Sequence, residues 1–264
     1  MSRNIFDPDE ALAHQQVKTR KKRTTRADKV DEGRTPTPKQ HEIERIEDKI
    51  KQFTPTPSQK TFINKIRSNT LTVVDAHAGV GKTAACLWYF TQEYLNNPQL
   101  NIMVVRTPVE LGDDKIGFLP DSASSKIAPH FESTKAILEQ FLGKSKVVAD
   151  LEKRIHFTIP NFILGKTIDN TLILIDECQT ISSGVMKLLL ERVGKNTKVV
   201  VAGCSQQMYT NDKKRNGLND LIGRFFNKED EDYVSKFNDT AIHQFTIDDV
   251  QRSDFVKTVI KAYM

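Results

Sequence analysis

Short apolar runs recur along the chain from about residue 57 onwards, and each has the length of a buried β-strand. Four of them are rich in β-branched residues and hold few polar positions, at 71–75, 101–106, 171–175 and 198–202. Shorter patterns predict two further strands, at 155–159 and in a segment that ends near Phe245. The chain therefore offers six candidate strands.

Helix-like spacing of apolar residues fills the intervals between these runs. It occurs at 58–69, 82–90, 132–145, 183–194 and 253–263. Pro129 is expected to interrupt the pattern ahead of residue 132. This alternation predicts an α/β fold, with a mainly parallel sheet covered by helices on both faces. Right-handed crossovers then gather the loops at the carboxyl ends of the strands, which is where such sheets bind ligands.

The first 55 residues follow different patterns. Residues 1–38 are polar, lack apolar periodicity and end in the turn-prone run RTPTP, so we expect a disordered arm. Residues 39–55 are predicted to form an amphipathic helix and linker, which docks either on the domain or on a neighbouring subunit. Its apolar face carries Ile43, Ile46, Ile50 and Phe53. Prolines end this helix, and residues 56–264 are expected to form one domain.

Composition narrows the class of protein. At 264 residues with 38% hydrophobic positions, the chain is long enough to bury a sizeable core. No run approaches the roughly 18 apolar residues of a membrane helix, and the N-terminus has no apolar signal core. The three cysteines, Cys86, Cys178 and Cys204, lack metal-site spacing and predict reduced, buried thiols. We therefore expect a soluble cytoplasmic protein with no membrane partner.

The net charge of +5 belongs to the N-terminal arm. Residues 18–26, KTRKKRTTR, hold six Lys and Arg and no acid, so the chain without them would carry −1. Two interpretations stay open for this cluster. It contacts nucleic-acid phosphates with strong salt dependence, or it is a solvated tail.

Residues 70–90, TLTVVDAHAGVGKTAACLWYF, combine a strand, a small-residue loop and a helix. This order is typical of phosphate binding, because the loop amides and the positive helix end converge on phosphate oxygens. The pattern is G-x-x-x-x-G-K-[ST], except that Ala76 stands at the first glycine. Lys82 is predicted to reach the β- and γ-phosphates, and the Thr83 hydroxyl to ligate Mg²⁺. An ordinary glycine-containing turn is the alternative.

The predicted nucleotide site extends beyond these two residues. Gln59, which follows a proline turn, is a candidate to read the adenine edge with its paired donor and acceptor. His77 is expected to contribute its backbone amide and not a titrating ring. The predicted nucleotide-binding residues are Gln59, Ala76, His77, Ala78, Gly79, Val80, Gly81, Lys82, Thr83 and Ala84.

Two adjacent acids end the apolar run TLILIDECQ. A carboxylate at the end of a buried strand is unfavourable unless a cation lies beside it, so Asp176 is a predicted Mg²⁺ ligand. Glu177 is the predicted residue that orients or deprotonates the attacking water. The alternative is a pair of ordinary helix N-terminal acids.

Three further polar residues are candidates for the reaction. Gln207, in the loop after the run VVVAG, is placed to bridge the γ-phosphate and the catalytic water. Arg192 and Arg252 are candidates to stabilise transition-state charge, within the chain or from a neighbour. A solvated loop glutamine and surface salt bridges are the respective alternatives.

Seven motifs occur in order between residues 57 and 256. They are PSQ at 57–59, AHAGVGKT at 76–83, VVRTPVELGDDKIGFLP at 104–120, LGKTIDNTLILIDECQ at 164–179, MKLLLERVG at 186–194, NGL at 216–218 and FTIDDVQRSDFV at 245–256. The chain from about 57 to 263 thereby resembles the PhoH family of ATPases, single-domain relatives of superfamily one helicases. The GFLP and DVQR segments are more specific than the phosphate loop.

The resemblance implies a RecA-like P-loop NTPase domain that uses ATP and Mg²⁺. It also implies a ring-forming homo-oligomer, with a hexamer as one option, and an association with phosphate starvation, including in bacterial viruses, so that a virus-encoded copy would act in the host cytoplasm. By resemblance, Gln207 is the sensor glutamine and Arg252 the C-terminal arginine, and the loop beside the nucleotide includes Arg106, Pro108, Gly117 and Phe118. Two departures, Ala76 and Cys204 in place of the usual aspartate, make slow turnover plausible.

Three functions compete at this stage. The first is a Mg²⁺-dependent ATPase that remodels RNA or single-stranded DNA as an oligomer, since one domain cannot sandwich ATP between two lobes. The second is a nucleotide-gated nucleic-acid-binding regulator with slow or no turnover. The third, a small-molecule kinase, is disfavoured because Glu177 and Gln207 suit water as the nucleophile.

Overall fold

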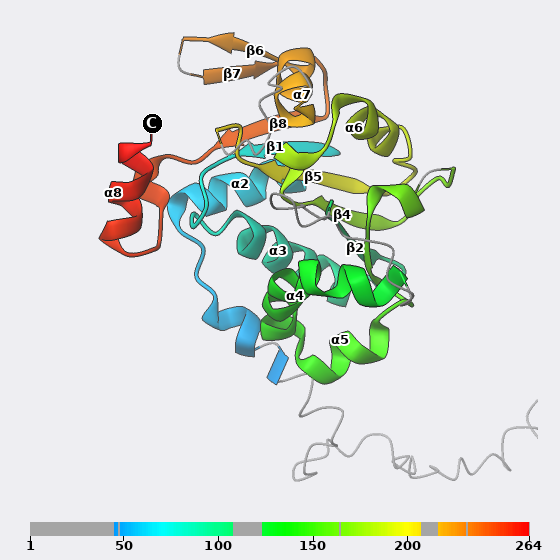
Figure 1. The fold of residues 1–264 in the computed structure, drawn as a ribbon. Helices are drawn as coiled ribbons and strands as arrows, with labels where there is room; N and C mark the ends of the chain where they lie inside the picture. Colours follow the sequence, from blue (N-terminus) through cyan, green and yellow to red (C-terminus); the bar gives the residue numbers. More distant parts are fainter. Residues whose placement is uncertain are drawn as a thin grey trace, which may run out of the picture. The chain divides into compact units, whose positions relative to one another are not determined.

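A six-stranded, all-parallel sheet forms the centre of the protein (Figure 1). The structure is a computed structural model and describes residues 45–46, 48–107, 123–163, 165–206, 216–230 and 232–263. The strands lie in the order β3-β2-β4-β5-β1-β8, and every neighbouring pair is parallel. Their bounds are β1 Leu71–Asp75, β2 Asn101–Val105, β3 Ile155–Thr158, β4 Thr171–Ile175, β5 Lys198–Gly203 and β8 Thr240–Gln244. The α/β prediction is confirmed.

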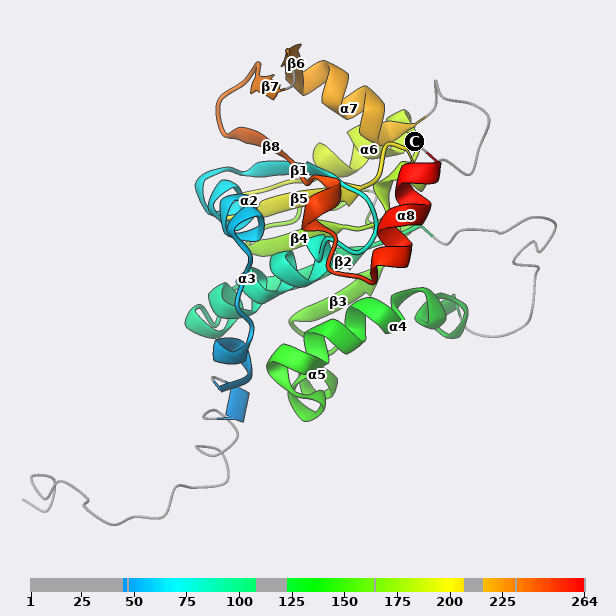
Figure 2. The ribbon, with the colours of Figure 1, turned by 90° about the vertical axis from the view of Figure 1, so that its left-hand side faces the viewer.

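Helices cover both faces of this sheet (Figures 1 and 2). One core lies under α2 Pro57–Ser68, α3 Lys82–Asn96, α4 Ala123–Leu142 and α5 Lys144–Asp150, and the other under α6 Ser183–Leu190 and α7 Gly217–Phe225. Strand β4 is buried throughout because its side chains alternate between the cores: Leu172 and Leu174 face the first, and Ile173 and Ile175 the second. A run of apolar residues without polar alternation therefore marks a strand covered on both sides.

The segment ahead of α2 packs on the same chain. Residues 45–46 and 48–52 are helical, and Ile46 is only 5% exposed. Phe53 contacts Trp88 with ring centroids 5.6 Å apart, and the Trp88 indole donates a hydrogen bond to the Ile50 carbonyl at 2.9 Å. Of the two docking options for this segment, the structure contains the one within the chain.

Two local features differ from the sequence expectations. Helix α4 continues through Pro129, because burial of Phe131 and Leu138 holds the helix on the core despite the hydrogen bond that a proline cannot donate. A two-stranded antiparallel hairpin, β6 Phe226–Glu229 and β7 Asp232–Ser235, was not predicted. Its strands are polar and largely exposed, so they lack the apolar alternation that marks a strand.

The cysteines lie where the sequence predicts, inside the protein. All three cysteines are buried thiols, and burial raises the pKa of Cys86 and Cys178 well above the ordinary value. Within the described ranges, no helix combines the length and apolar composition needed to cross a membrane.

His243 links the C-terminal strand to α2. Its ring stacks on Phe62 at a centroid distance of 5.7 Å and meets Phe245 edge-on at 4.6 Å, while Nε2 lies 3.1 Å from the Ser58 hydroxyl. Burial lowers the pKa of His243 to about 4, and the Lys65 charge adds to this effect. The neutral ring is therefore the form that the fold prefers.

This burial makes stability depend on pH. Between pH 6.5 and 4 the unfolded chain binds a proton at His243 that the folded chain rejects, so the free energy of unfolding falls as the pH is lowered. We expect about 2 kcal/mol of this loss between pH 7 and pH 5, and a His243→Gln variant should lack it. Urea unfolding at both pH values measures the difference. A His130→Gln control, outside the cluster, should behave as the unmodified chain; equal losses in both variants would contradict the assignment.

Candidate functional site

The loop between β1 and α3 has the geometry of an anion-binding turn. Gly79 and Gly81 have φ values of 92° and 78°, in the left-handed region that favours glycine, and Gly81 caps the amino end of α3. Ala76 lies outside that region, and its backbone N–H donates to the Gly203 carbonyl at 2.9 Å. Alanine is therefore compatible with the first position, while the two later glycines are required.

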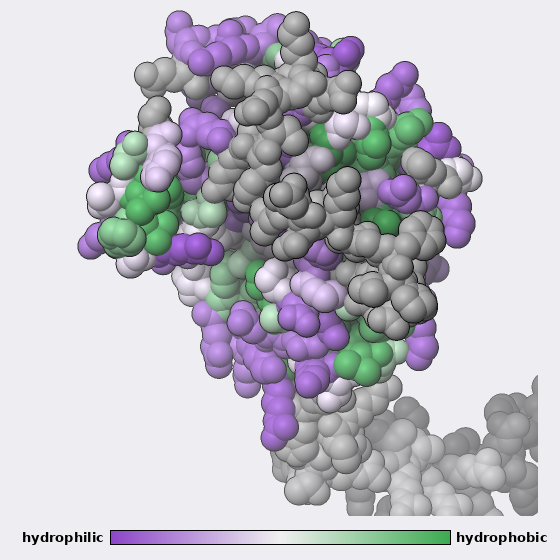
Figure 3. Space-filling view, viewed as in Figure 1, coloured by the Kyte–Doolittle hydropathy of each residue, from purple (hydrophilic) through white to green (hydrophobic). Residues whose placement is uncertain are grey.

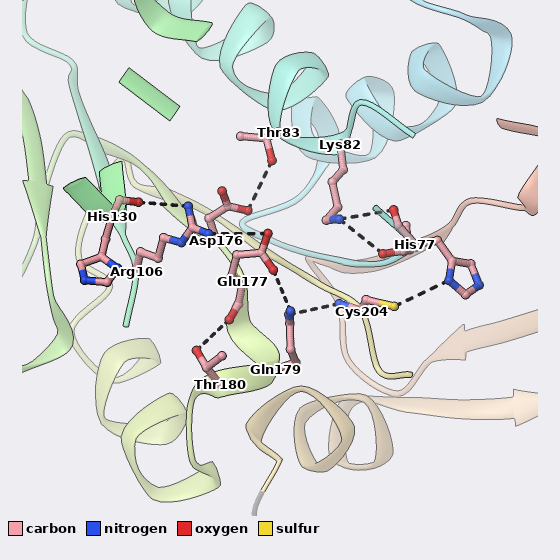
Figure 4. Close-up of polar contacts among 11 residues, drawn as sticks. His77, Lys82, Thr83, Arg106, His130, Asp176, Glu177, Gln179, Thr180 and Cys204 are labelled. Carbon is pink, nitrogen blue, oxygen red and sulfur yellow. Dashed lines mark hydrogen bonds and ion pairs between the residues drawn. The ribbon is translucent and has the colours of Figure 1, made fainter. Parts of the chain in front are cut away.

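Lys82 folds back over this loop (Figure 4). Its side chain is buried, and Nζ lies 3.3 Å from the Ala76 carbonyl oxygen and 3.4 Å from that of His77. An ammonium group held above a helix amino end and a glycine-rich turn forms a cradle for phosphate oxygens. The residues present thus fit a polyphosphate.

Asp176 directly follows β4 and is only 3% exposed. Its Oδ1 accepts a hydrogen bond from the Thr83 hydroxyl at 3.3 Å, and its backbone N–H donates to the Val105 carbonyl at 2.9 Å. Burial raises the pKa of Asp176, and the neighbouring Glu177 charge raises it further, while Arg106 and Lys82 oppose the shift. A buried carboxylate beside a hydroxyl is a hard-oxygen donor pair, which fits Mg²⁺.

Glu177 lies beside this pair and is held by Gln179, two residues further on, and by Arg106, which follows β2 (Figure 4). Its backbone adopts a left-handed φ of 51°, which is unusual for a residue with a side chain and is typical of functional sites. Oε2 accepts a hydrogen bond from Gln179 Nε2 at 2.6 Å, and Oε1 lies 3.9 Å from Arg106 Nη2. The side chain is one-third exposed, at 33%, so water can reach the carboxylate.

Gln179 is a site residue that the sequence reasoning missed. Its Nε2 contacts Glu177, and its Oε1 accepts a hydrogen bond from the Cys204 backbone N–H at 3.2 Å, so it connects the ends of β4 and β5. Gly203 leaves the space for it, since a Cβ there would lie 2.7 Å from Gln179 Oε1. The available signal was the glutamine that ends the DECQ motif.

Gln59 is built into the phosphate loop. It is 2% exposed; Nε2 donates to the Val80 carbonyl at 2.9 Å, and Oε1 accepts from the Thr56 backbone N–H at 3.1 Å. Both ends of the amide therefore have partners inside the protein. Its contact with adenine stays a prediction.

The C-terminal segment also reaches the loop. The Gln251 backbone N–H donates to the Gly79 carbonyl at 3.0 Å. A Cβ added at Gly79 would lie 2.9 Å from Arg252 Cδ, so the arginine stem lies directly over the loop. Arg252 thus adjoins the phosphate cradle of its own chain, ahead of α8 Asp254–Ala262.

The remaining candidates lie elsewhere. Arg192 follows α6, and its carbonyl accepts a hydrogen bond from the Ile168 backbone N–H, just before β4 begins. It therefore lies at the amino ends of the strands, whereas the phosphate loop lies at their carboxyl ends. Gln207, Pro108, Gly117 and Phe118 lie outside the described residues. Cys204, at the position where an aspartate was expected, has its Sγ 3.9 Å from His77 Nδ1.

A phosphate loop between β1 and α3, faced by acids at the end of β4 in an all-parallel sheet, defines a P-loop NTPase domain. Residues 50–264 match the family model described as PhoH-like protein. The chain belongs to this family, which is a family of P-loop ATPases.

Known proteins support the same assignment. Protein PhoH of Escherichia coli (strain K12) is 28% identical over 212 residues, covering 78% of this chain and 56% of that protein. A PhoH-like protein of Mycobacterium tuberculosis (strain ATCC 25618 / H37Rv) is 27% identical over 209 residues, covering 79% and 56%. A PhoH-like protein of Synechocystis sp. (strain ATCC 27184 / PCC 6803 / Kazusa) is 26% identical over 206 residues, covering 78% and 60%. The chain thus spans somewhat more than half the length of these relatives.

Proposed function

We propose that this protein binds ATP with Mg²⁺ and hydrolyses it, and that hydrolysis drives remodelling of RNA or single-stranded DNA. The observation that carries the proposal is the pair of acids after β4. Asp176 contacts Thr83 at the start of α3, while Glu177 stands beside it, partly open to water and oriented by Gln179. A protein that only bound nucleotide would have no need of the second, oriented carboxylate.

The residues divide into three tasks. Lys82 and the loop amides of residues 76–84 bind the phosphates, and Thr83 with Asp176 would hold Mg²⁺. When bound, Mg²⁺ neutralises charge on the β- and γ-phosphates. Glu177 orients a water and accepts its proton as the water oxygen attacks the γ-phosphorus; the bond from that phosphorus to the β-phosphate oxygen breaks, and ADP leaves with both electrons of that bond.

The arginines and the sensor glutamine complete the proposal. Arg252, which already lies over Gly79, is assigned to the phosphates of its own chain. Arg192 lies at the amino ends of the strands, away from the phosphate loop, so we assign it to the nucleotide of a neighbouring subunit. Gln207 is proposed to sense the γ-phosphate, and Gln59 to contact adenine.

Self-association is part of this proposal. Helix α8 exposes large apolar side chains, with Phe255 at 74% and Val259 at 39%, and Figure 3 shows hydrophobic residues gathered over this helix. The patch begins just after Arg252, whose side chain lies over Gly79 of the phosphate loop. A second copy bound to this patch would therefore lie close to the nucleotide. A ring-shaped homo-oligomer, for example a hexamer, would supply the second wall that one domain lacks.

The function is tested by phosphate release from ATP, measured with Mg²⁺, with EDTA, and with added oligo(U) or oligo(dT), on samples whose mass is determined by light scattering. We expect Mg²⁺-dependent release that rises at least severalfold with polymer. No retention and no cleavage of ATP under any of these conditions would refute the proposal.

A nucleotide-gated regulator with slow turnover is the second candidate, and one observation favours it. Cys204 occupies the position of a metal- or water-organising aspartate, and its thiol faces His77. Tight ATP binding with turnover that polymer leaves unchanged would select this function over the motor.

A further inference from the structure

A groove of about 640 Å³ runs along the outer edge of the sheet, well away from the phosphate loop. Strand β3 is the last strand on that side, and Figure 2 places it beside α4. We call this cavity the edge groove. Its lining includes the aromatic and basic side chains of Phe131, Lys135, His156, Phe157, Phe162 and Lys166.

We propose that the edge groove binds a short stretch of single-stranded nucleic acid, with bases stacked on its aromatic side chains and phosphates bound by its two lysines. The proposal rests on the proposed function and deepens it, because it assigns a place on the protein to the polymer.

The aromatic side chains form stacking surfaces. Phe162, on the short 3₁₀ turn Pro160–Phe162, is 56% exposed, so its ring is open to solvent. Phe157 in β3 is half-buried and is supported from behind by buried Phe131, with ring centroids 5.5 Å apart. Rigid rings open to solvent are the feature with which proteins stack unpaired bases.

The charges complement a phosphate backbone. Lys135 on α4 and Lys166 after the 3₁₀ turn lie on different walls of the groove, and Glu152 is its only acidic lining residue among those described. Lys135 has one ion pair, a loose contact of 3.9 Å with Glu139. Within the described ranges Lys166 has no acidic partner. Both ammonium groups can therefore turn to a bound anion at little expense.

The backbone of β3 argues against a peptide that adds a strand here. The strand has four residues, and its Ile155 carbonyl already accepts a hydrogen bond from the Glu152 N–H at 2.9 Å. Since alternate residues face β2, only Phe157 presents backbone groups to the outer edge. A single residue is too short a template for β-augmentation.

The edge groove connects to the nucleotide site through Arg106. The Arg106 backbone N–H donates to the Thr158 carbonyl at 3.2 Å, and Nη1 donates to the His130 carbonyl at 3.0 Å. Thr158 lines the groove, and His130 precedes Phe131 on its α4 wall. Arg106 Nη2 also lies 3.9 Å from the Glu177 carboxylate. A bound nucleic acid that moves α4 relative to β3 would therefore shift Glu177, the residue proposed to position water.

The test uses the full chain and a fluorescein-labelled oligo(U) 20-mer, followed by anisotropy in 50 to 200 mM salt. Phe162→Ala and Lys166→Glu alter exposed side chains and should leave the fold intact. We expect each to weaken binding about tenfold, and Lys166→Glu to lower the salt slope by about one. The matched controls are Phe237→Ala, whose ring is equally exposed at 56%, and Lys228→Glu on the hairpin; neither should change the affinity.

A second readout separates failure of this proposal from failure of the function. Phe162→Ala and Lys166→Glu should keep basal ATP hydrolysis while requiring about tenfold more oligo(U) for half-maximal stimulation. If both variants bind and respond to oligo(U) as the unmodified chain does, the edge groove is overturned and the ATPase proposal stands. An unchanged response to oligo(U) is also expected if the natural ligand of the groove is a peptide, and it overturns the proposal in the same way. If the unmodified chain hydrolyses ATP but binds no oligo(U), the groove and the polymer coupling both fail.

Discussion

Replacing Lys82 with alanine is expected to lower ATP hydrolysis roughly a thousandfold, a larger loss than any of the other proposed substitutions should cause. The charge of Lys82 acts in a buried position above the glycine turn, where electrostatic stabilisation of a transferring phosphoryl group is strongest. Removal should not unfold the protein, because the contacts of Nζ with the loop carbonyls are long, at 3.3 and 3.4 Å. Steady-state phosphate release measures the loss.

The control for this variant is Lys187→Ala. Its side chain is 76% exposed, and its ion pair is with Glu191, one turn further along the chain, so hydrolysis should be unchanged. A Lys82→Ala protein that remains folded and retains more than about a tenth of the activity would show that the loop does not work as a phosphate cradle.

Replacing Glu177 with glutamine should separate binding from chemistry. We expect ATP affinity to be nearly unchanged and turnover to fall at least about a hundredfold, because an amide cannot accept a proton from water. The side chain keeps its size, and its oxygen can still accept the hydrogen bond from Gln179. The ion pair with Arg106 is lost, but at 3.9 Å between partly exposed groups it contributes little to stability.

Fluorescent ATP binding together with single-turnover hydrolysis measures these two quantities. Glu191→Gln, a surface change outside the site, serves as control and should be silent. Full turnover in Glu177→Gln would remove this residue from the role of base.

The fold could be predicted largely from local patterns. The run 171–175 coincides with β4 because an apolar strand buried on both faces has sharp polar boundaries. Helix α3 begins at Lys82, directly after the glycine whose left-handed backbone ends the loop. Local sequence carries such information, since it depends only on burial and on allowed backbone angles.

Contacts between distant segments could not be predicted from local sequence patterns. Nothing in the spacing of the chain places Arg106 between His130 and Glu177, or Gln179 against Cys204, because these contacts depend on strand order. The position of Arg192 could not be predicted for a related reason: an arginine after a helix gives no sign of the end of the sheet at which it lies. For Pro129, tertiary packing outweighed a local rule.

One consequence concerns mechanical force. Because Gln59 joins the first turn of α2 to the Val80 carbonyl, tension on the chain ahead of Pro57 is transmitted to the glycine turn through only a few hydrogen bonds. The same tension also acts on α3, because Phe53 and the Ile50 carbonyl contact Trp88. Pulling on this segment would therefore load the turn that cradles phosphate together with the helix that follows it.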